Sequence, residues 1–284
     1  MQEIVEKTNI LIEALPYIKR FRGKEFLIKY GGAAMLYEDI RESVLQDLVF
    51  MQYVGIKPIL IHGGGHLITE NFKKHGLESR FVDGLRVTNK AAIGIVVETL
   101  AGLNKSIVSD LNRLGAKAEG LSGHDAKILH VIKRRASEDV GYVGEVVSVN
   151  TKPIRKPTDR NIIPVIYGVG IDKNKETYNI NADEAAVKIA VAMEVQKLMV
   201  LTNVQGIMRN PADETTLISS LRVGDVQSLH EKKVIQGGMI PKVQAGVTAL
   251  KGGVKKAHII DGRLKHSMLL EIFTDQGIGT EIIL

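Results

Sequence analysis

The stretch Phe26-Leu27-Ile28-Lys29-Tyr30-Gly31-Gly32 decides how this chain folds. A run of apolar residues that is typical of a buried strand stops at a lysine and two glycines. Glycine lets the main chain approach a ligand closely, and a helix after the turn would add its positive N-terminal end. The stretch Ile59-Leu60-Ile61-His62-Gly63-Gly64-Gly65 repeats this design without the lysine. Two turns of this kind predict a site for an anion that is being transferred.

Each turn also has a plain structural interpretation, namely a tight turn that needs glycine dihedral angles. The chain contains neither G-x-x-x-x-G-K-[ST] nor G-x-G-x-x-G. It therefore predicts neither a P-loop nor a dinucleotide-binding fold, and the functional interpretation depends on further motifs.

Strand-like and helix-like segments alternate around these turns, which is typical of a parallel sheet with helices on its faces. A boundary between two lobes is expected near residue 195. The expected strands are 26–30, 58–61, 162–169, 197–201 and 258–261, with a hairpin within 128–150. The expected helices are 8–21, 39–53, 91–114, one that begins at Asp183, helices within 223–250 on both sides of Gly237-Gly238, and 267–273.

Composition excludes several classes of protein. The 284 residues are 44% hydrophobic and 25% charged, as in ordinary soluble proteins, and they include no Cys for disulfides or thiol chemistry. We find no signal pattern at the N-terminus and no apolar run of the ~20 residues that a membrane span needs. A net charge of +6 suits anionic small molecules, whereas 5% aromatic residues without Trp argue against nucleic acid. The sequence predicts a cytoplasmic protein.

The expected helix at 8–21 precedes the first core strand and carries an apolar stripe that includes Leu15 and Ile18. Pro16 lies inside the pattern and predicts a kink. The stripe either packs on its own domain or contacts a partner subunit. Residues 1–22 are therefore a candidate oligomerisation helix.

Three segments have compositions that packing alone explains poorly. The segment Tyr178-Asn179-Ile180-Asn181-Ala182-Asp183 directs amides and a carboxylate from one loop, although Asp183 would also serve as a helix N-cap. Gly237-Gly238-Met239-Ile240-Pro241-Lys242 supplies a second lysine next to glycines. In Gly84-Leu85-Arg86-Val87-Thr88, Arg86 either clamps a carboxylate in bidentate fashion or is an ordinary surface arginine.

These segments resemble the amino acid kinase family, and within it the members that phosphorylate N-acetylglutamate. The resemblance extends over essentially the whole chain. It implies an α/β fold, a three-layer α/β/α sandwich with a largely parallel open sheet, in which residues 23–195 bind the amino-acid substrate and residues 196–284 bind the nucleotide. The motifs are Lys29-Tyr30-Gly31-Gly32, His62-Gly63-Gly64-Gly65, Gly84-Leu85-Arg86-Val87-Thr88, Gly141-Tyr142-Val143-Gly144, Asn179-x-Asn181-Ala182-Asp183 and Gly238-Met239-Ile240-Pro241-Lys242.

The resemblance implies ATP-dependent phosphorylation of the side-chain carboxylate of N-acetyl-L-glutamate, the second step of arginine biosynthesis, with Mg²⁺ carried by the nucleotide. A carboxylate with a pKa of ~4.3 is already ionised, so no general base is needed. The implied catalytic residues are Lys29 and Lys242, which would stabilise the transferring and leaving phosphoryl oxygens, and Asp183, which would hold both ammonium groups. Arg86 and Asn179 would bind the substrate together with Gly64 and Gly65, while Gly31, Gly32 and Gly63 would line the path of the phosphoryl group.

This chain departs from the family pattern at several places, two of which lie in the expected nucleotide pocket. Asn203 and Gln205 stand where Asp is usual, and His124 stands where Lys is usual. The loss of two carboxylates beside the nucleotide makes the local field more positive. The implied nucleotide-binding residues are Asn203, Val204, Gln205, Gly206, Ile207, Met208, Val234, Ile235 and Gln236.

The helix around Pro16 resembles the kinked helix of family members that form ring-shaped hexamers, as trimers of dimers, and are inhibited by arginine. Arginine is therefore a candidate effector of this chain, and a PII-type signalling protein is a candidate regulator. The implied effector residues are Tyr17, Lys197, His258, Glu271 and Gly277.

Two alternatives stay open at this point. The phosphate-binding lysine and glycines would serve equally in a glutamate 5-kinase, an aspartokinase, a carbamate kinase or an aminoadipate-type kinase. The altered Asn203–Gln205 segment would also fit a non-catalytic subunit that senses arginine or a nucleotide. His62 and His66 flank a glycine turn and are not spaced as a zinc pair, so they are expected to be packed or surface histidines.

Overall fold

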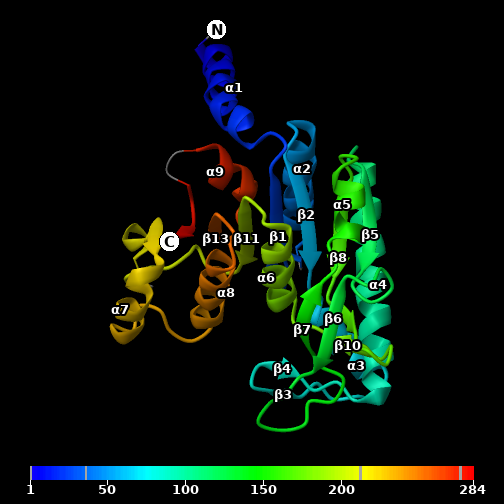
Figure 1. The fold of residues 1–284 in the computed structure, drawn as a ribbon. Helices are drawn as coiled ribbons and strands as arrows, with labels where there is room; N and C mark the ends of the chain where they lie inside the picture. The colour runs from blue at the N-terminus through cyan, green and yellow to red at the C-terminus, as the bar shows by residue number, and fades with distance from the viewer. Residues whose placement is uncertain (1, 36, 211–212, 275–276) are drawn as a thin grey trace.

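The computed structural model describes residues 2–35, 37–210, 213–274 and 277–284, with side chains from residue 12 onward except those of residues 33 and 34. Its middle layer is an eight-stranded sheet in the order β12-β14-β13-β11-β1-β2-β8-β5 (Figure 1). Neighbouring strands are parallel, except for the antiparallel pair β13 and β14. The strands are β1 (Glu25–Tyr30), β2 (Lys57–His62), β5 (Ala118–Ser122), β8 (Ile163–Tyr167), β11 (Lys197–Thr202), β12 (Ser220–Arg222), β13 (Lys256–Asp261) and β14 (Thr280–Ile283).

Helices cover both faces of this sheet (Figure 1). One layer is formed by α5 (Lys152–Thr158), α6 (Ala182–Met193) and α8 (Met239–Lys251). The opposite layer is formed by α2 (Glu38–Tyr53), α4 (Lys90–Arg113) and α9 (Ser267–Phe273). The short helix α3 (Gly65–Lys74) packs on α4, and α7 (Val226–Glu231) precedes α8.

The central strand β1 shows how the sequence specifies this sandwich. Leu27 belongs to the core on the α6 side, whereas Phe26 and Ile28 belong to the core on the α2 side, and all three are fully buried. Successive side chains of a strand point to opposite faces. Lys29, two residues after Leu27, therefore lies on the face that α6 covers.

Two smaller sheets lie beyond the carboxyl end of β2 (Figure 1). One has the order β10-β9-β6-β7, and the other is the hairpin of β3 and β4. Within the first, β6 and β7 form an antiparallel pair, which confirms the hairpin expected within 128–150. Their bounds are β3 (Phe81–Val82), β4 (Leu85–Arg86), β6 (Leu129–Lys133), β7 (Gly144–Val149), β9 (Val169–Ile171) and β10 (Thr177–Asn179).

The predicted fold class is confirmed, with two differences in the elements. The strand expected at 162–169 divides at Gly168 into β8 and β9, and a side chain at this position would lie 2.8 Å from the main-chain oxygen of Ile180. The sequence pattern also does not predict α3, α5, the edge strands β5 and β12, or the strand β14. The sheet continues across residue 195, since β11 pairs directly with β1, and the division into a substrate lobe and a nucleotide lobe stays a prediction.

The N-terminal helix α1 (Gln2–Phe21) contains Pro16 and is longer than the expected 8–21 (Figure 1). Tyr17 meets the ring of Phe273 on α9 edge-on, with centroids 6.4 Å apart. Ile12 and Leu15 are 63% and 42% exposed. Leu15 belongs to the predicted stripe, which therefore packs on this chain only in part. The stripe also includes Ile10 and Leu11, whose side chains lie outside the described part of the chain.

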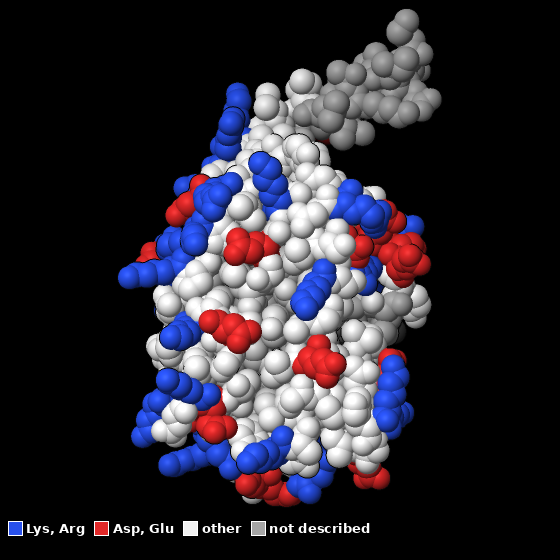
Figure 2. Space-filling model, turned by 90° about the vertical axis from the view of Figure 1, so that its right-hand side faces the viewer, with Lys and Arg blue, Asp and Glu red and all other residues white. Residues whose placement is uncertain are grey.

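Helix α4 is the one described helix that is long and apolar enough to cross a membrane. Core helices pass the same test of length and composition, and α4 packs against β5, β8 and α2 in the sandwich. Its contacts are those of a helix in an outer layer of the sandwich. On the face seen in Figure 2, basic and acidic side chains are interspersed and form no single basic stripe.

Candidate active site

A cavity of about 220 Å³ opens where β1 and β2 end. Its walls come from the two glycine turns, the β3–β4 hairpin, β10 and the start of α6. It brings together residues that lie up to 154 positions apart in the sequence, from position 29 to position 183. Of the predicted site residues, it contains Lys29, Gly31, Gly32, Gly63, Gly64, Gly65, Arg86, Asn179 and Asp183.

The ammonium group of Lys29 and the carboxylate of Asp183 form an ion pair, with Nζ 2.9 Å from Oδ1. Lys29 faces α6 because of its position in β1, and Asp183 lies in the first turn of that helix. The helix is capped by Asn181, whose Oδ1 accepts hydrogen bonds from the N–H groups of Asp183 (2.8 Å) and Glu184 (3.3 Å). The interpretation of Asp183 as a plain N-cap is therefore wrong, and its carboxylate is directed at the lysine.

Arg86 is 8% exposed, which contradicts its interpretation as an ordinary surface arginine. Its guanidinium donates to Ser79 Oγ (2.6 Å), to the main-chain oxygen of Gly65 (2.7 Å) and to Thr69 Oγ1 (3.0 Å). The ring of Phe81 lies 4.7 Å from its central carbon. Burial lowers the pKa of Arg86. No carboxylate of the described residues pairs with this group, so a buried cation faces the cavity without a fixed counter-ion.

Asn179 is linked to Arg86 through one hydroxyl group. Its Nδ2 donates to Thr88 Oγ1 at 3.3 Å, and the same hydroxyl donates to the main-chain oxygen of Arg86 at 2.9 Å. Thr88 is fully buried. The main chain of Arg86 and the amide of Asn179 are thereby joined on the wall of the cavity.

Lys242 lies in the first turn of α8, and its Nζ donates to the main-chain oxygen of Gly238 at 2.9 Å. It is not among the residues that line the cavity at Lys29. The preceding residue, Pro241, lines a surface groove between α6 and α8 that Asp183 also lines. The start of α8 is therefore near the ion pair, and the convergence of Lys242 on the same phosphoryl group stays a prediction.

The predicted nucleotide residues follow β11 and precede α8. Ile207 and Ile235 are buried in the core, and the N–H of Ile207 donates to Thr280 Oγ1 at 2.8 Å. These two side chains are therefore core residues, whereas Asn203 and Gln236 are exposed. Val204, Gln205 and Met208 are partly exposed, as is Val234.

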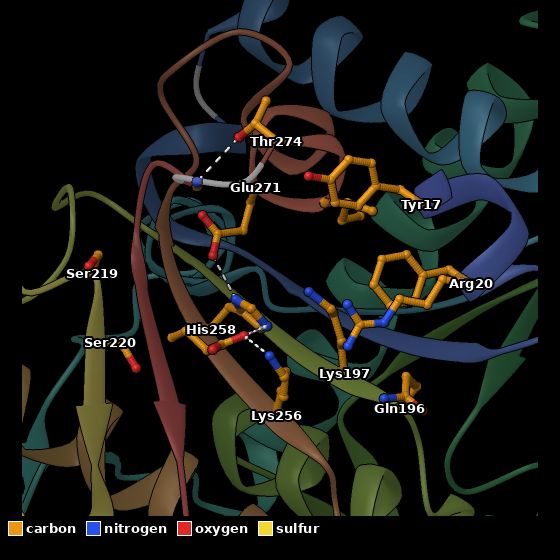
Figure 3. A pocket seen from close by; sticks show the side chains of 14 residues that line it. Tyr17, Arg20, Gln196, Lys197, Ser219, Ser220, Lys256, His258, Glu271 and Thr274 are labelled. Atoms are coloured by element: carbon orange, nitrogen blue, oxygen red, sulfur yellow. Dashed lines mark hydrogen bonds and ion pairs between the residues drawn. The ribbon is translucent and has the colours of Figure 1, made fainter. Parts of the chain in front are cut away.

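A separate cavity of about 240 Å³ lies between α1, α9 and the strands β11 and β13 (Figure 3). It contains all the predicted effector residues: Tyr17, Lys197, His258, Glu271 and Gly277. It also contains Arg20, Lys256 and Glu281, which the sequence analysis does not single out.

Charges alternate within this second cavity. Burial lowers the pKa of Lys197 to about 8, although Glu281 and Glu271 act in the opposite sense. Burial also lowers the pKa of His258, so the neutral ring donates from Nδ1 to Glu271 Oε1 at 2.6 Å. Glu281 pairs with Lys256 at 2.7 Å (Figure 3). Separate cationic and anionic groups of this kind suit a small dipolar ion.

The sequence pattern does not predict the residues that hold Arg86, namely Ser79 and Thr69 at its guanidinium and Thr88 at its main-chain oxygen. Thr88 belongs to the same sequence motif as Arg86, so proximity in sequence was an available signal. Ser79 and Thr69 come from a loop and a helix whose approach to Arg86 depends on the tertiary fold. Among the described residues, no group of three or more His, Asp or Glu side chains could hold a metal ion.

The sequence pattern of the amino acid kinase family matches residues 24–261. The acetylglutamate kinase of Heliobacterium modesticaldum is 48% identical over the whole of both chains, and that of Caldanaerobacter subterraneus is 50% identical over 97% of this chain and 93% of its own. The N-acetylglutamate synthase of Neisseria gonorrhoeae, complexed with coenzyme A and N-acetyl-glutamate, has a TM-score of 0.85 at 27% identity; the match covers 98% of this chain and 63% of the synthase. Carbamate kinase of Giardia lamblia, at 17% identity and a TM-score of 0.65, shares the fold.

Proposed function

This chain belongs to the amino acid kinase family, and we propose that it transfers the γ-phosphoryl group of ATP to the side-chain carboxylate of N-acetyl-L-glutamate. The product is N-acetyl-L-glutamyl 5-phosphate, an intermediate of arginine biosynthesis. The full-length relatives named acetylglutamate kinase support this substrate.

The observation that carries the proposal is Arg86, a buried guanidinium without a carboxylate partner among the described residues. A substrate carboxylate would provide that partner, and Arg pairs with carboxylates through two parallel hydrogen bonds. Asn179, linked to Arg86 through Thr88, offers an amide for the acetamido end of the same molecule. Both features fit an acylated amino acid and exceed what carbamate would require.

The reaction meets an electrostatic difficulty, since a carboxylate must approach a polyphosphate. Catalysis of phosphoryl transfer rests on alignment and on cations placed where negative charge develops. Lys29 would stabilise the oxygens of the transferring group. Asp183 would keep that ammonium group in place and would take no proton. Lys242 would approach from the start of α8, on the side of the leaving β-phosphate, once its hydrogen bond to Gly238 is exchanged for one to phosphate.

The nucleotide would occupy the region around the loop after β11 and the start of α8. Mg²⁺ would arrive on the ATP phosphates, because Mg²⁺ is usually held by substrate phosphates with few protein ligands. The described residues offer no acidic cluster that would bind it independently. Asn203 and Gln205 would make the surroundings of the nucleotide more positive than carboxylates do.

A hydroxamate assay tests the reaction directly, because hydroxylamine traps the acyl phosphate itself. With ATP and Mg²⁺, N-acetyl-L-glutamate should give hydroxamate, whereas glutamate, aspartate, carbamate and N-acetyl-aminoadipate should give little. A clear preference for free glutamate or aspartate would show that the preferred amino acid, and not N-acetyl-L-glutamate, is the substrate. No turnover of any acceptor, together with arginine or nucleotide binding, would favour the non-catalytic sensing subunit.

We further infer that the second cavity binds L-arginine and that the enzyme is a homohexamer built as a trimer of dimers. Lys197 would meet the α-carboxylate of arginine, and Glu271 with Glu281 would meet its cationic groups. A structure of the Neisseria gonorrhoeae synthase, 26% identical to this chain, contains L-arginine. Because Tyr17 comes from α1, a ligand here would bear on the helix that is proposed to join dimers. A PII-type regulator remains a proposal from resemblance alone, and so does a cytoplasmic location.

The effector proposal predicts inhibition by millimolar arginine in wild-type protein. Lys197→Met should abolish inhibition while kcat without arginine is kept, because the cavity is separate from Lys29 and Asp183. The matched control is Lys105→Met, which lies outside the second cavity. A dimer that is indifferent to arginine would overturn both the effector and the hexamer.

A further inference from the structure

We propose that His62 and Asn104 act together as positioning residues that hold the amide of Gly64 toward the cavity, where it stabilises the transferring phosphoryl group. This inference rests on the proposed function. It concerns two buried side chains, of which His62 borders the cavity, and it starts from their hydrogen bonds to each other and to the main chain.

His62 is the last residue of β2 and is fully buried. Its Nδ1 lies 2.9 Å from the main-chain oxygen of Gly63, and its Nε2 lies 3.1 Å from Nδ2 of Asn104. Nδ2 of Asn104 also donates to the main-chain oxygen of Val165 on β8 at 2.9 Å. Asn104 is 4% exposed and comes from α4. The imidazole is therefore fixed at both nitrogens.

These contacts select one tautomer of His62. A carbonyl oxygen only accepts hydrogen bonds, so Nδ1 must carry the hydrogen that reaches Gly63. The amide nitrogen of Asn104 only donates, so Nε2 must accept. Burial lowers the pKa of His62 to about 4, which keeps the ring neutral at physiological pH. Asn104 thus keeps the hydrogen on the nitrogen that faces Gly63.

The bond to Gly63 sets the orientation of the next peptide. In a trans peptide the C=O and the following N–H point in opposite directions. The oxygen of Gly63 is directed at the buried imidazole, so the N–H of Gly64 points to the other side, and Gly64 lines the cavity. Within the described residues this N–H makes no backbone hydrogen bond.

The consequence is electrostatic. An N–H that is fixed before the reaction stabilises charge on the transferring group without reorganisation. If this glycine peptide rotated, its carbonyl oxygen would face the same anion and repel it. Glycine dihedral angles offer little resistance to such a rotation, which is why a side-chain lock is needed here.

Three variants and one spectroscopic measurement test whether His62 and Asn104 hold the peptide between Gly63 and Gly64. His62→Leu removes the donor and should lower kcat by about tenfold to 100-fold, toward the effect of losing one preorganised donor. His62→Asn places an amide nitrogen near the position of Nδ1 and should recover most of the activity. Asn104→Asp replaces the donor by a carboxylate, which favours hydrogen on Nε2, and should also lower kcat. The control is His75→Leu, an exposed residue at the end of α3.

Nitrogen-15 spectra of histidine-labelled wild-type protein read the tautomer without any folding risk. His62 should show hydrogen on Nδ1 only, unchanged between about pH 6 and pH 8. Hydrogen on Nε2, or wild-type kcat in folded His62→Leu, would overturn this inference alone. Wild-type protein that forms no acyl phosphate would overturn the proposed function, and this inference with it.

Discussion

Lys29 is the residue on which the chemistry of the site depends most directly. Its ammonium group is held by Asp183 at the carboxyl edge of the sheet. We expect Lys29→Ala to lower kcat by at least ~100-fold, the scale for losing one preorganised stabiliser of the transition state. ADP release under saturating substrates measures it. Lys188→Ala, an exposed lysine on the same helix as Asp183, is the control and should keep wild-type turnover.

Lys242→Ala is expected to have an effect of the same size, although Lys242 bonds to its own helix in the structure. The roles of the two lysines can therefore be tested independently of each other. Near-normal kcat in Lys242→Ala with loss in Lys29→Ala would refute the role of Lys242 and leave that of Lys29. Near-normal kcat in both would refute the phosphoryl site.

Arg86 should determine affinity for the acceptor more than the rate of transfer. Arg86→Lys keeps the positive charge and loses the planar guanidinium that can donate two parallel hydrogen bonds. Because hydrogen bonds to charged groups contribute about 1.5–3 kcal/mol, KM for N-acetyl-L-glutamate should rise about 10-fold to 100-fold, with KM for ATP unchanged. Arg80→Lys, at an exposed arginine of the neighbouring loop, should change neither constant. An equal rise of both KM values would indicate general damage to the site.

At the scale of elements, the predictable part of the site follows from strand parity and helix starts. Lys29 and Asp183 meet because one faces α6 from β1 and the other lies in the first turn of α6. The sequence places the first at the end of a strand and the second at the start of a helix, whereas their pairing is implied by the family resemblance. Glu281 is not predictable in this way. It lies opposite His258 in the pair of β13 and β14, and no pattern in the short C-terminal segment predicts that strand or its register.

The contact between α2 and α9 predicts how stability changes with pH. Asp47 on α2 is fully buried, and its Oδ1 lies 2.7 Å from Nδ1 of His266. Burial raises the pKa of Asp47 to about 6, although His266 acts to lower it. The folded state thus binds this proton more tightly than the unfolded state does. This contribution to stability is present below about pH 4 and is lost as the pH rises through about 6.

Asp47→Asn cannot ionise and should remove that part of the pH dependence, up to about 3 kcal/mol between pH 4 and pH 7. Its amide oxygen can still accept from His266. Urea unfolding across this range measures the free energy of unfolding in both proteins. Asp39→Asn, at an exposed carboxylate in α2, is the control and should leave the pH dependence of the free energy of unfolding unchanged. If the free energy of unfolding changed with pH in the same way in wild type and Asp47→Asn, the prediction would be contradicted.

At the scale of the whole molecule, the two cavities are connected through the packing of helices. Tyr17 on α1 and Glu271 on α9 line the second cavity. Helix α9 packs on α2, which follows the turn that contains Gly31 and Gly32. If α1 joins subunits as proposed, a ligand between α1 and α9 would affect both subunit assembly and the phosphoryl site, because these helices pack on one another.

The exposed apolar residues of α1 provide the test of assembly. We expect the double variant Ile12→Asp and Leu15→Asp to convert a hexamer into dimers, because each carboxylate would have to be buried in the contact between neighbouring dimers. Light scattering after gel filtration gives the mass. The matched control is Ile132→Asp, at a 53% exposed isoleucine on β6. Dimers formed in this way should keep the kcat of the uninhibited enzyme and lose the response to arginine, since α1 would no longer be held between subunits. An unchanged mass, or a wild-type protein that is already a dimer, would mean that α1 does not join dimers.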